Sequence, residues 1–279
     1  MLILNYGKET YPSPCAFVLG CFDGIHLGHD TLVQKAAETG LPVGLMLLKG
    51  KGEKALYTME ERLLIAEKIG VDFCLVVELN EETKRTRWDR FLETILNRIP
   101  VDTFFCGEDF RFGDRAEGTP ALISTLKRVV AVPLLERNGR KISSSEVRRL
   151  VSEGNIRRAN ELLAYPFFVL GQVRHGRQVG RTYGFPTANI LYPAEKTPLG
   201  FGVYAVRVGD KVGIANYGGR PTFGEENPLL EVYIDDFEGD LYGKQIEVVF
   251  TEKIREIRSF SSKEELSEQL RKDIQKVRV

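Results

Sequence analysis

Short apolar runs separated by helical patterns fill the first half of the chain. The apolar runs lie at Cys15–Leu19, Val43–Leu48, Phe73–Val77, Thr103–Cys106 and Val129–Leu134. Between them apolar residues recur at helical spacing, most clearly from Trp88 to Ile99, and Thr58 and Glu61 have the spacing of a capping box. Strands that alternate with helices predict a parallel sheet covered on both faces, which is a doubly wound α/β domain.

The pattern changes near residue 165. A helical pattern stops at Tyr165-Pro166, and strand-like runs then follow one another with glycine-rich turns between them. These runs lie at Phe167–Arg174, Val203–Val208, Val212–Tyr217, Leu230–Asp236 and Gln245–Thr251. Successive strands predict an antiparallel barrel or sandwich, and a last helix opens at the capping pair Ser262 and Glu265. We therefore predict two domains, residues 1–164 and 165–279.

Composition narrows the class of protein. The 279 residues are enough for two cores, and 39 Lys and Arg balance 39 Asp and Glu. A neutral chain is not typical of proteins that hold nucleic acid by neutralising phosphates. No stretch approaches the roughly 18 apolar residues of a membrane span, and the first residues lack a signal-peptide pattern. Four cysteines without C-x-x-C spacing favour reduced thiols, so we expect a cytoplasmic protein without membrane contact.

The loop after the first apolar run carries the strongest candidate chemistry. Leu19–His29 reads LGCFDGIHLGH and leads into a helical pattern. His26 and His29 stand three residues apart, which places both imidazoles on one side of a first helical turn. Unpaired amides and the helix dipole favour an anion there, and Gly24 and Gly28 leave room for it. The string predicts a site that grips a triphosphate.

Two further loops follow apolar runs, at Gly107–Gly113 (GEDFRFG) and Ser143–Arg148 (SSSEVR). In a parallel sheet ligands lie beyond the carboxyl ends of the strands, so we expect these loops to meet the first one. Taken alone, Ser143 and Glu146 also fit an ordinary capped helix. The histidine pair also fits half of a zinc site, although zinc needs about four ligands and the one other histidine is His175.

The second half offers its own polar groups. Gly176–Ile190 reads GRQVGRTYGFPTANI, and its glycines let backbone amides face phosphate. The hydroxyl of Thr187 and the amide oxygen of Asn189 are hard ligands that suit Mg²⁺. The alternation in Leu230–Ile234 leaves Glu231 on the polar face of a strand, where it also fits an ordinary solvated residue.

These motifs resemble those of the bacterial bifunctional riboflavin kinase/FAD synthetase family. G-x-F-D-G-x-H-x-G-H, G-x-D-F-x-F-G and S-S-[ST]-x-[IV]-R occur in order within residues 15–165, and G-F-P-T-A-N-I and E-V-Y-I-D-D-F occur within residues 165–277. The resemblance implies a Rossmann-like nucleotidyltransferase domain followed by a six-stranded riboflavin kinase-like barrel with a C-terminal helix. It also implies that ATP and Mg²⁺ convert riboflavin to FMN, and FMN to FAD with release of pyrophosphate.

The resemblance further implies residue roles for adenylyl transfer. His26, His29 and Arg148 are expected to be catalytic cations that contact the phosphates of ATP. The residues expected to bind nucleotide in one or the other half are Phe22, Asp23, Gly24, Gly28, Gly107, Asp109, Ser143, Ser144, Gly180, Gly184 and Pro186.

For the kinase half, Glu231 is expected to take the proton of the riboflavin 5′-hydroxyl. Thr187 and Asn189 are expected to hold Mg²⁺, and Arg255 and Phe260 to contact the flavin.

Two departures from the family pattern leave alternatives open. Lys49–Lys54 stands where the family has a T-F-x-P-H-P-like segment, and Ile257 stands where the family has Glu. A kinase whose N-terminal domain binds nucleotide without making FAD is therefore one alternative. A non-enzymatic RNA-binding barrel is another, which the neutral charge disfavours. The expected partners are small molecules and not nucleic acid, and the pattern leaves the oligomeric state open.

Overall fold

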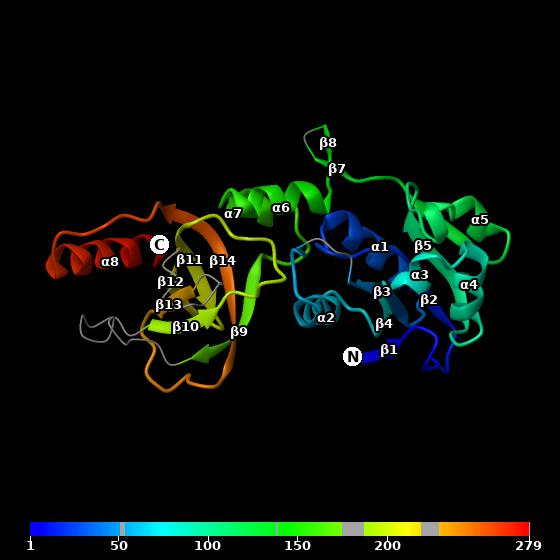
Figure 1. Cartoon of the computed structure of the whole chain (residues 1–279), viewed down its shortest axis with the longest axis horizontal. Coiled ribbons are helices and arrows are strands. Elements are labelled where there is room, and N and C mark those ends of the chain that lie inside the picture. Colours follow the sequence, from blue (N-terminus) through cyan, green and yellow to red (C-terminus); the bar gives the residue numbers. More distant parts are fainter. Residues whose placement is uncertain (51–53, 138, 175–186, 219–228, 279) are drawn as a thin grey trace. The chain divides into compact units, whose positions relative to one another are not determined.

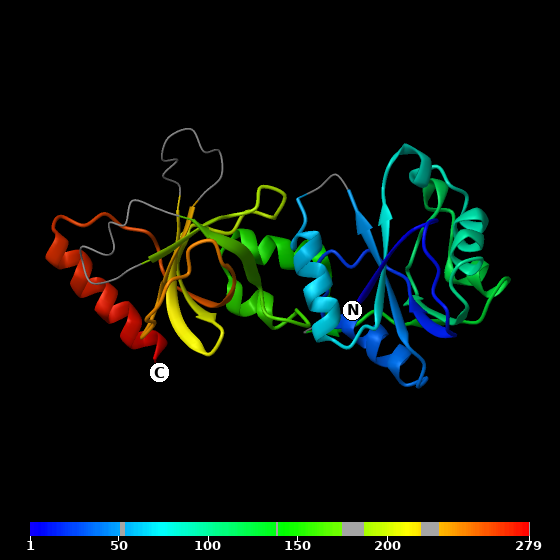
Figure 2. The same ribbon diagram turned by 90° about the horizontal axis from the view of Figure 1, so that it is seen from below.

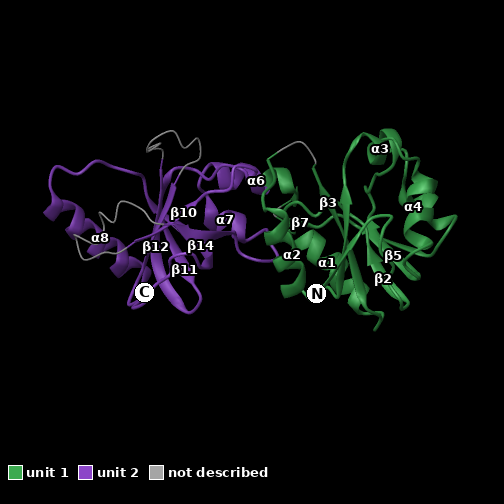
Figure 3. Cartoon of the chain, turned by 60° about the horizontal axis from the view of Figure 1, so that its bottom comes forward, with its two compact units in different colours: residues 1–146 green, residues 147–279 purple. Residues whose placement is uncertain are grey.

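The chain folds into two compact units, which are described separately here. The computed structural model describes residues 1–50, 54–137, 139–174, 187–218 and 229–278 (Figure 1). Unit 1 comprises Met1–Glu146 and unit 2 comprises Val147–Val279 (Figure 3). No helix within the described residues is both long and apolar enough to cross a membrane.

Unit 1 is built on a six-stranded parallel sheet with helices on both sides (Figure 2). Its strands are β1 (Leu2–Asn5), β2 (Cys15–Val18), β3 (Val43–Lys49), β4 (Phe73–Glu78), β5 (Val101–Gly107) and β6 (Val129–Val132). They lie in the order β1-β4-β3-β2-β5-β6, and every neighbouring pair is parallel. The predicted doubly wound α/β fold is confirmed. The edge strand β1 was not predicted, because only Leu4 of its four residues is buried and the apolar pattern is short.

The helices of unit 1 begin and pack as the apolar pattern predicts. They are α1 (Leu27–Ala37), α2 (Met59–Lys68), α3 (Glu81–Lys84), α4 (Trp88–Leu96), a 3₁₀ turn (Asp114–Ala116), α5 (Pro120–Ser124) and the start of α6 (Ser144–Ser152). The capping box of α2 is present: Thr58 Oγ1 accepts from the Glu61 amide (3.2 Å), and Glu61 Oε2 accepts from the Thr58 amide (2.8 Å). The apolar stripe of α4 packs into the core with Phe91, Leu92 and Ile95 buried. A short hairpin, β7 (Glu136–Arg137) and β8 (Arg140–Lys141), precedes α6.

Strand β2 lies at the centre of the sheet, between β3 and β5. The chain leaves β2 through α1 toward β3, and it leaves β5 through α5 toward β6 on the other side. The loops that follow β2 and β5 therefore part from each other at adjacent strand ends. Such a switch point is where open α/β sheets bind ligands. It brings together the histidine loop and the Gly107–Gly113 loop.

Unit 2 is a closed six-stranded barrel with antiparallel neighbours, as predicted. Its strands are β9 (Phe168–Arg174), β10 (Thr187–Leu191), β11 (Gly202–Val208), β12 (Lys211–Gly218), β13 (Leu229–Ile234) and β14 (Gln245–Arg255). Their order around the barrel is β10-β13-β12-β11-β14-β9. The residue pattern did not single out β10, since its five residues directly follow a stretch rich in glycine.

Two helices complete unit 2, α7 (Ile156–Asn160) and α8 (Lys263–Val277). Asn160 ties α7 to the barrel: its Nδ2 donates to the Phe250 carbonyl, and its Oδ1 accepts from the Phe167 amide, both at 2.8 Å. Helix α7, which precedes residue 165, thus packs with the barrel, and the predicted domain boundary at 164/165 stays a prediction. Helix α8 starts at Ser262, whose Oγ accepts from the Glu265 amide (3.2 Å).

Candidate active sites

The first candidate site is built where β2 turns into α1. His26 is the N-cap of α1 with extended backbone, and its carbonyl accepts from the amides of His29 (2.8 Å) and Asp30 (3.0 Å). The rings of His26 and His29 stack, with centroids 3.8 Å apart and planes 12° apart. The two imidazoles therefore lie on one side of the helix start, as their spacing predicts.

Burial favours the neutral form of both histidines. It lowers the pKa of His26 to about 4, with a smaller contribution in the same direction from the positive charge of Lys141. Burial also lowers the pKa of His29, well below its usual value, and the neighbouring His26 adds to this. Burial therefore favours neutral imidazoles here, and the role of the two rings as cations toward the phosphates of ATP stays a prediction. Both Nδ1 atoms are buried without a hydrogen-bond partner among the described residues, so they are available to a ligand.

The loop that carries the histidines holds a strained backbone. Phe22 (φ 46°) and Ile25 (φ 34°) both occupy the left-handed region that side chains other than glycine rarely adopt. The Phe22 ring packs against His29, with centroids 4.4 Å apart. A Cβ on Gly20 would lie 2.5 Å from the Phe22 ring, so glycine is required there. Such strain costs about 1–3 kcal/mol per residue and persists where surrounding packing enforces it.

The start of α6 meets this loop within unit 1. A Cβ on Gly24 would lie 3.2 Å from Ser144 Oγ, so the absence of a side chain lets the two segments approach. Ser143 Oγ accepts from the Glu146 amide (3.3 Å), which caps α6 as predicted. A Cβ on Gly28 would lie 3.2 Å from the His26 ring. The N-termini of α1 and α6 thus lie together, and both favour an anion.

A lysine that the motifs did not include joins this site. Lys141 Nζ lies 2.5 Å from Asp109 Oδ2, and its charge reaches His26. Asp109 belongs to the loop after β5, where a Cβ on Gly107 would lie 3.1 Å from Asp109 Oδ1. The structure therefore brings the predicted Gly107 loop and the β7–β8 hairpin to the histidines. The signal in the sequence that could have identified Lys141 was its position two residues before Ser143.

Two predicted parts of this site are not tested by the geometry of unit 1. Arg148 lies one turn after Ser144 on α6, beyond the last residue of unit 1, and its contact with phosphate stays a prediction. Of the Lys49–Lys54 segment, Lys49 ends β3, and residues 51–53 lie outside the described residues.

The second candidate site is a row of side chains across three strands of the barrel. Glu231 of β13 pairs in register with Asn189 of β10 and with Asn216 of β12. Asn216 Nδ2 lies 3.5 Å from Glu231 Oε2. Burial alternates along Leu229–Ile234, which confirms the predicted alternation and leaves Glu231 partly exposed. Thr187 lies two residues before Asn189 and so shares its strand face, which gathers hydroxyl, amide and carboxylate oxygens. Gly180, Gly184 and Pro186 lie outside the described residues.

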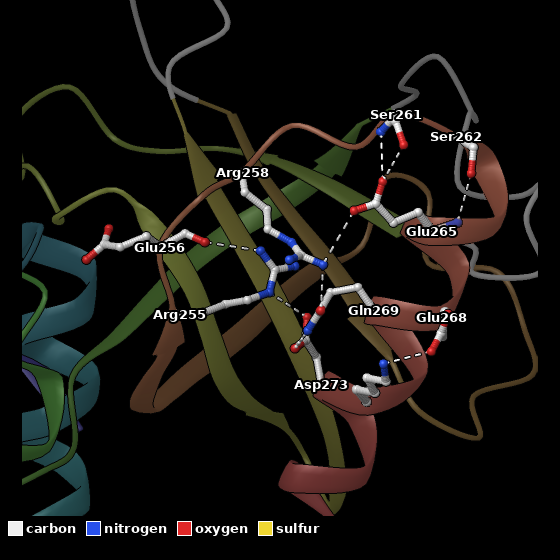
Figure 4. A network of polar contacts seen from close by, with 10 residues as sticks. Arg255, Glu256, Arg258, Ser261, Ser262, Glu265, Glu268, Gln269 and Asp273 are labelled. Atoms are coloured by element: carbon white, nitrogen blue, oxygen red, sulfur yellow. Dashed lines mark hydrogen bonds and ion pairs between the residues drawn. The ribbon is translucent and has the colours of Figure 1, made fainter.

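Arg255 and Phe260 are both expected to contact flavin, and Arg255 lies beside α8 (Figure 4). Arg255 Nε donates to Oδ2 of the fully buried Asp273 (2.8 Å), and Nη1 donates to the Glu256 carbonyl (3.1 Å). The Arg255 guanidinium lies 5.7 Å from the centre of the Phe260 ring. Arg255 therefore fixes α8 to β14, and its contact with flavin stays a prediction.

Two further features adjoin this network. Ile257, in place of the family's Glu, lies so close to the end of β12 that a Cβ on Gly218 would come within 2.4 Å of Ile257 Cδ1. An open hollow of about 400 Å³ is lined by residues 258–263 and Leu266. It includes Phe260 but none of the Glu231 row, so the row and the hollow are separate features.

No group of three His, Cys, Asp or Glu side chains is arranged to hold a metal ion in the part of the chain that the structure describes. His175 lies outside that part. The histidine pair thus gains no further ligand of these types from the described residues.

Comparisons with known proteins match both halves of the chain. The FAD synthetase family matches residues 8–146, and the riboflavin kinase family matches residues 163–279. A Haemophilus influenzae protein named bifunctional riboflavin kinase/FMN adenylyltransferase is 35% identical over 94% of this chain and 92% of its own. A Bacillus subtilis protein of the same name is 35% identical over 92% of this chain and 89% of its own. A crystal structure from Streptococcus pneumoniae, described as a macrolide-efflux protein, has a TM-score of 0.88 and 27% identity and covers 100% of this chain and 99% of its own.

Proposed function

Because the chain belongs to the bifunctional riboflavin kinase/FMN adenylyltransferase family, we propose that its two units divide the two reactions between them. The protein phosphorylates riboflavin with ATP to FMN and adenylylates FMN with ATP to FAD. Unit 1 is assigned the adenylyl transfer and the barrel the kinase reaction. The observation that carries this division is that each half matches its own family and has its own cluster of polar groups.

In unit 1, a phosphate oxygen of FMN attacks the α-phosphorus of ATP, and the bond to the departing pyrophosphate breaks. No covalent enzyme intermediate is needed, so the residues act by positioning and charge stabilisation. The buried nitrogens of His26 and His29 hydrogen-bond phosphate oxygens, which the low pKa values allow because neutral imidazole still has an N–H donor. Lys141 and Arg148 supply the fixed positive charge. An anion beside the rings also favours their protonation, which strengthens these bonds as pyrophosphate departs.

The remaining predicted contacts of unit 1 surround these groups. Ser143 and Ser144 offer hydroxyls and amides at the start of α6. We assign the nucleotide also to Phe22, Asp23, Gly24, Gly28, Gly107 and Asp109.

In the barrel, the riboflavin 5′-hydroxyl attacks the γ-phosphorus of ATP, its proton passes to the carboxylate of Glu231, and ADP leaves. A carboxylate beside a phosphate site is the arrangement that phosphoryl transfer requires. Asn216 lies within reach to orient this carboxylate. Gly180, Gly184 and Pro186 are assigned to ATP, and Arg255 and Phe260 to the flavin, on the family resemblance alone.

Mg²⁺ fits the donors of this strand face. Thr187, Asn189 and Glu231 provide hydroxyl, amide and carboxylate oxygens, which are hard ligands. We propose that Thr187 and Asn189 hold Mg²⁺ with ATP, where the ion neutralises phosphate charge.

We further propose a boundary between the two activities at 164/165 and a cytoplasmic location. The location is supported by the cysteines, all four of which are free and three of which are buried.

One experiment tests the division. The protein is incubated with riboflavin, ATP and Mg²⁺, and FMN and FAD are separated by chromatography. Both products are expected. FMN without FAD would support the alternative of a kinase with a binding-only N-terminal domain, and no flavin phosphate at all would overturn both enzyme assignments.

A further inference from the structure

Arg62 is a buried arginine to which the mechanism above gives no role. It lies on α2, directly after Glu61 of the capping box, and only 6% of its surface is exposed. Its Nη1 donates to the carbonyl of Leu48 near the end of β3, at 2.7 Å. Burial of an arginine is unusual unless its charge is paired.

The partner charge comes from the histidine loop. Asp23 is 7% exposed and lies between Phe22 and Ile25, the two strained residues of that loop. Its negative charge raises the pKa of Arg62, whereas burial, the larger effect, lowers it. Asp23 Oδ1 also accepts from the amide of Leu56, at 3.1 Å.

These contacts tie both ends of one segment to the histidine loop. Leu48 comes just before Lys49–Lys54 and is held by Arg62, whose charge interacts with that of Asp23. Leu56 comes just after this segment and is held by Asp23 directly. The segment that departs from the family pattern therefore has its two ends fixed to the loop that carries His26 and His29.

Stability alone does not account for this arrangement. Taking two charges out of water is costly, and a buried ion pair is often no more stable than apolar side chains of the same size. The Arg62 Nε atom, moreover, is buried without a hydrogen-bond partner among the described residues. A residue that is costly to bury and incompletely paired is typical of a functional site.

We propose that Asp23 and Arg62 are a positioning pair for adenylyl transfer, which holds the histidine loop and the end of β3 in the reactive arrangement. The proposal rests on the assignment of this reaction to unit 1. Besides the nucleotide contact assigned to it above, Asp23 then acts through the loop that it fixes, and Arg62 acts through Asp23 and Leu48. Neither residue needs to touch the reacting phosphorus.

The test compares Arg62→Lys, Arg62→Met and the double variant Asp23→Asn/Arg62→Met in the full-length protein. FAD formation from supplied FMN gives kcat and KM for ATP, and riboflavin phosphorylation by the same sample reports on unit 2. Thermal unfolding followed by the fluorescence of Trp88, the one tryptophan of the chain, reports on unit 1. Arg98→Met is the control. Arg98 Nη1 also donates to a backbone carbonyl, that of Lys8 (2.9 Å), but Arg98 comes just before β5, at the amino end of that strand, whereas the candidate site lies at the carboxyl ends.

We expect Arg62→Met to lower kcat for FAD formation by about 100-fold with little change in KM, because misplaced groups slow the chemical step. The double variant removes the unpaired buried charge and is expected to restore thermal stability without restoring kcat. Arg62→Lys keeps the charge but lacks the planar fork, so it is expected to lose about tenfold. The rate of riboflavin phosphorylation in each Arg62 variant is expected to stay within about twofold of the parent value. FAD formation by the Arg98→Met control is also expected to stay within about twofold, because independent sites affect each other by no more than this.

The proposal is overturned if the folded double variant makes FAD within threefold of the parent protein, or if Arg62→Lys keeps the parent kcat. Should both methionine variants unfold, Arg62→Lys alone decides by the same criterion. His29→Ala separates this proposal from the function on which it rests. If His29→Ala loses FAD formation while the Arg62 variants keep it, only the positioning role is wrong; if the parent protein makes no FAD, the assignment of unit 1 is wrong.

Discussion

The two candidate sites are built by different means from similar chemical groups. In unit 1, loops that follow β2, β5 and β8 meet at the switch point of a parallel sheet, so residues far apart in the chain share one site. In unit 2, Glu231, Asn189 and Asn216 stand in register on three hydrogen-bonded strands. A loop site depends on caps, glycines and buried charges to fix its backbone, whereas a strand site takes its geometry from the register of the barrel.

The electrostatics differ in the same way. In unit 1 the Nδ1 atoms of His26 and His29 are buried, and burial favours the neutral form of both rings. Glu231 stands on a partly exposed strand face of the barrel. Substitutions in unit 1 are therefore expected to affect stability, pH dependence and activity together, and substitutions in the Glu231 row to affect activity alone.

The largest effect is expected from Glu231→Gln. Removal of the base should lower FMN formation from riboflavin by about 10³-fold, within the usual range for general-base catalysis. FAD formation from supplied FMN should not change, since the two sites are separate. Chromatographic assays of both reactions on one sample measure this. Glu252→Gln, on exposed β14 sequence, is the control for loss of a carboxylate from the barrel.

His29→Ala is expected to do the reverse. Loss of one buried phosphate donor should lower FAD formation by about 10²-fold and leave FMN formation intact. His29→Asn keeps an N–H donor and should lose less. If His29→Ala and Glu231→Gln each abolish both reactions, the sites are not independent and the comparison between them fails.

The parts of both sites that sequence could predict are those with a local signal. The histidine pair was visible because strand, glycines and helix start lie within eleven residues, Leu19–His29. Glu231 was visible because strand alternation needs only its neighbours. The capping pairs Thr58 with Glu61 and Ser262 with Glu265 were visible for the same reason.

What sequence could not predict depends on packing between distant segments. Lys141 and Arg62 are common residue types, and their importance comes from Asp109 and Asp23, tens of residues away. The lowered pKa of His26 could not be predicted, because it comes from burial, which no local motif reveals. Strand β1 was missed because its apolar pattern is short, and its place in the sheet is set by pairing with the distant β4.

The lowered pKa values of the two histidines predict an acid-dependent stability of unit 1. Because the pKa of His26 is about 4 in the folded state against 6.5 ordinarily, the unfolded chain binds a proton first as pH falls. The free energy of unfolding of unit 1 should therefore fall between pH 7 and pH 5, by about 2 kcal/mol from His26 alone. Urea unfolding followed by Trp88 fluorescence measures it.

Two variants separate His26 from other acid-sensitive groups. His26→Gln should remove this part of the pH dependence. Lys141→Met should weaken it, because the lysine charge helps to lower the pKa of His26. An unchanged slope in His26→Gln would show that other groups control the acid response.

The smallest effects are expected from the two helix caps, and they test whether the units respond separately. Thr58→Ala removes the hydroxyl half of the capping box on α2 and should lower the stability of unit 1 by about 1 kcal/mol. Ser262→Ala removes the corresponding bond on α8, where the Glu265 carboxylate accepts from the Ser261 amide and not from that of the cap residue. The loss of stability should be of similar size but confined to unit 2. Hydrogen exchange followed by mass spectrometry locates each loss, and Trp88 fluorescence should shift only for Thr58→Ala. Because α2 also carries Arg62, Thr58→Ala is further expected to lower FAD formation slightly, whereas Ser262→Ala should leave FAD formation unchanged. Equal effects of the two substitutions on FAD formation would mean that residues outside unit 1 also determine the geometry of the loop site.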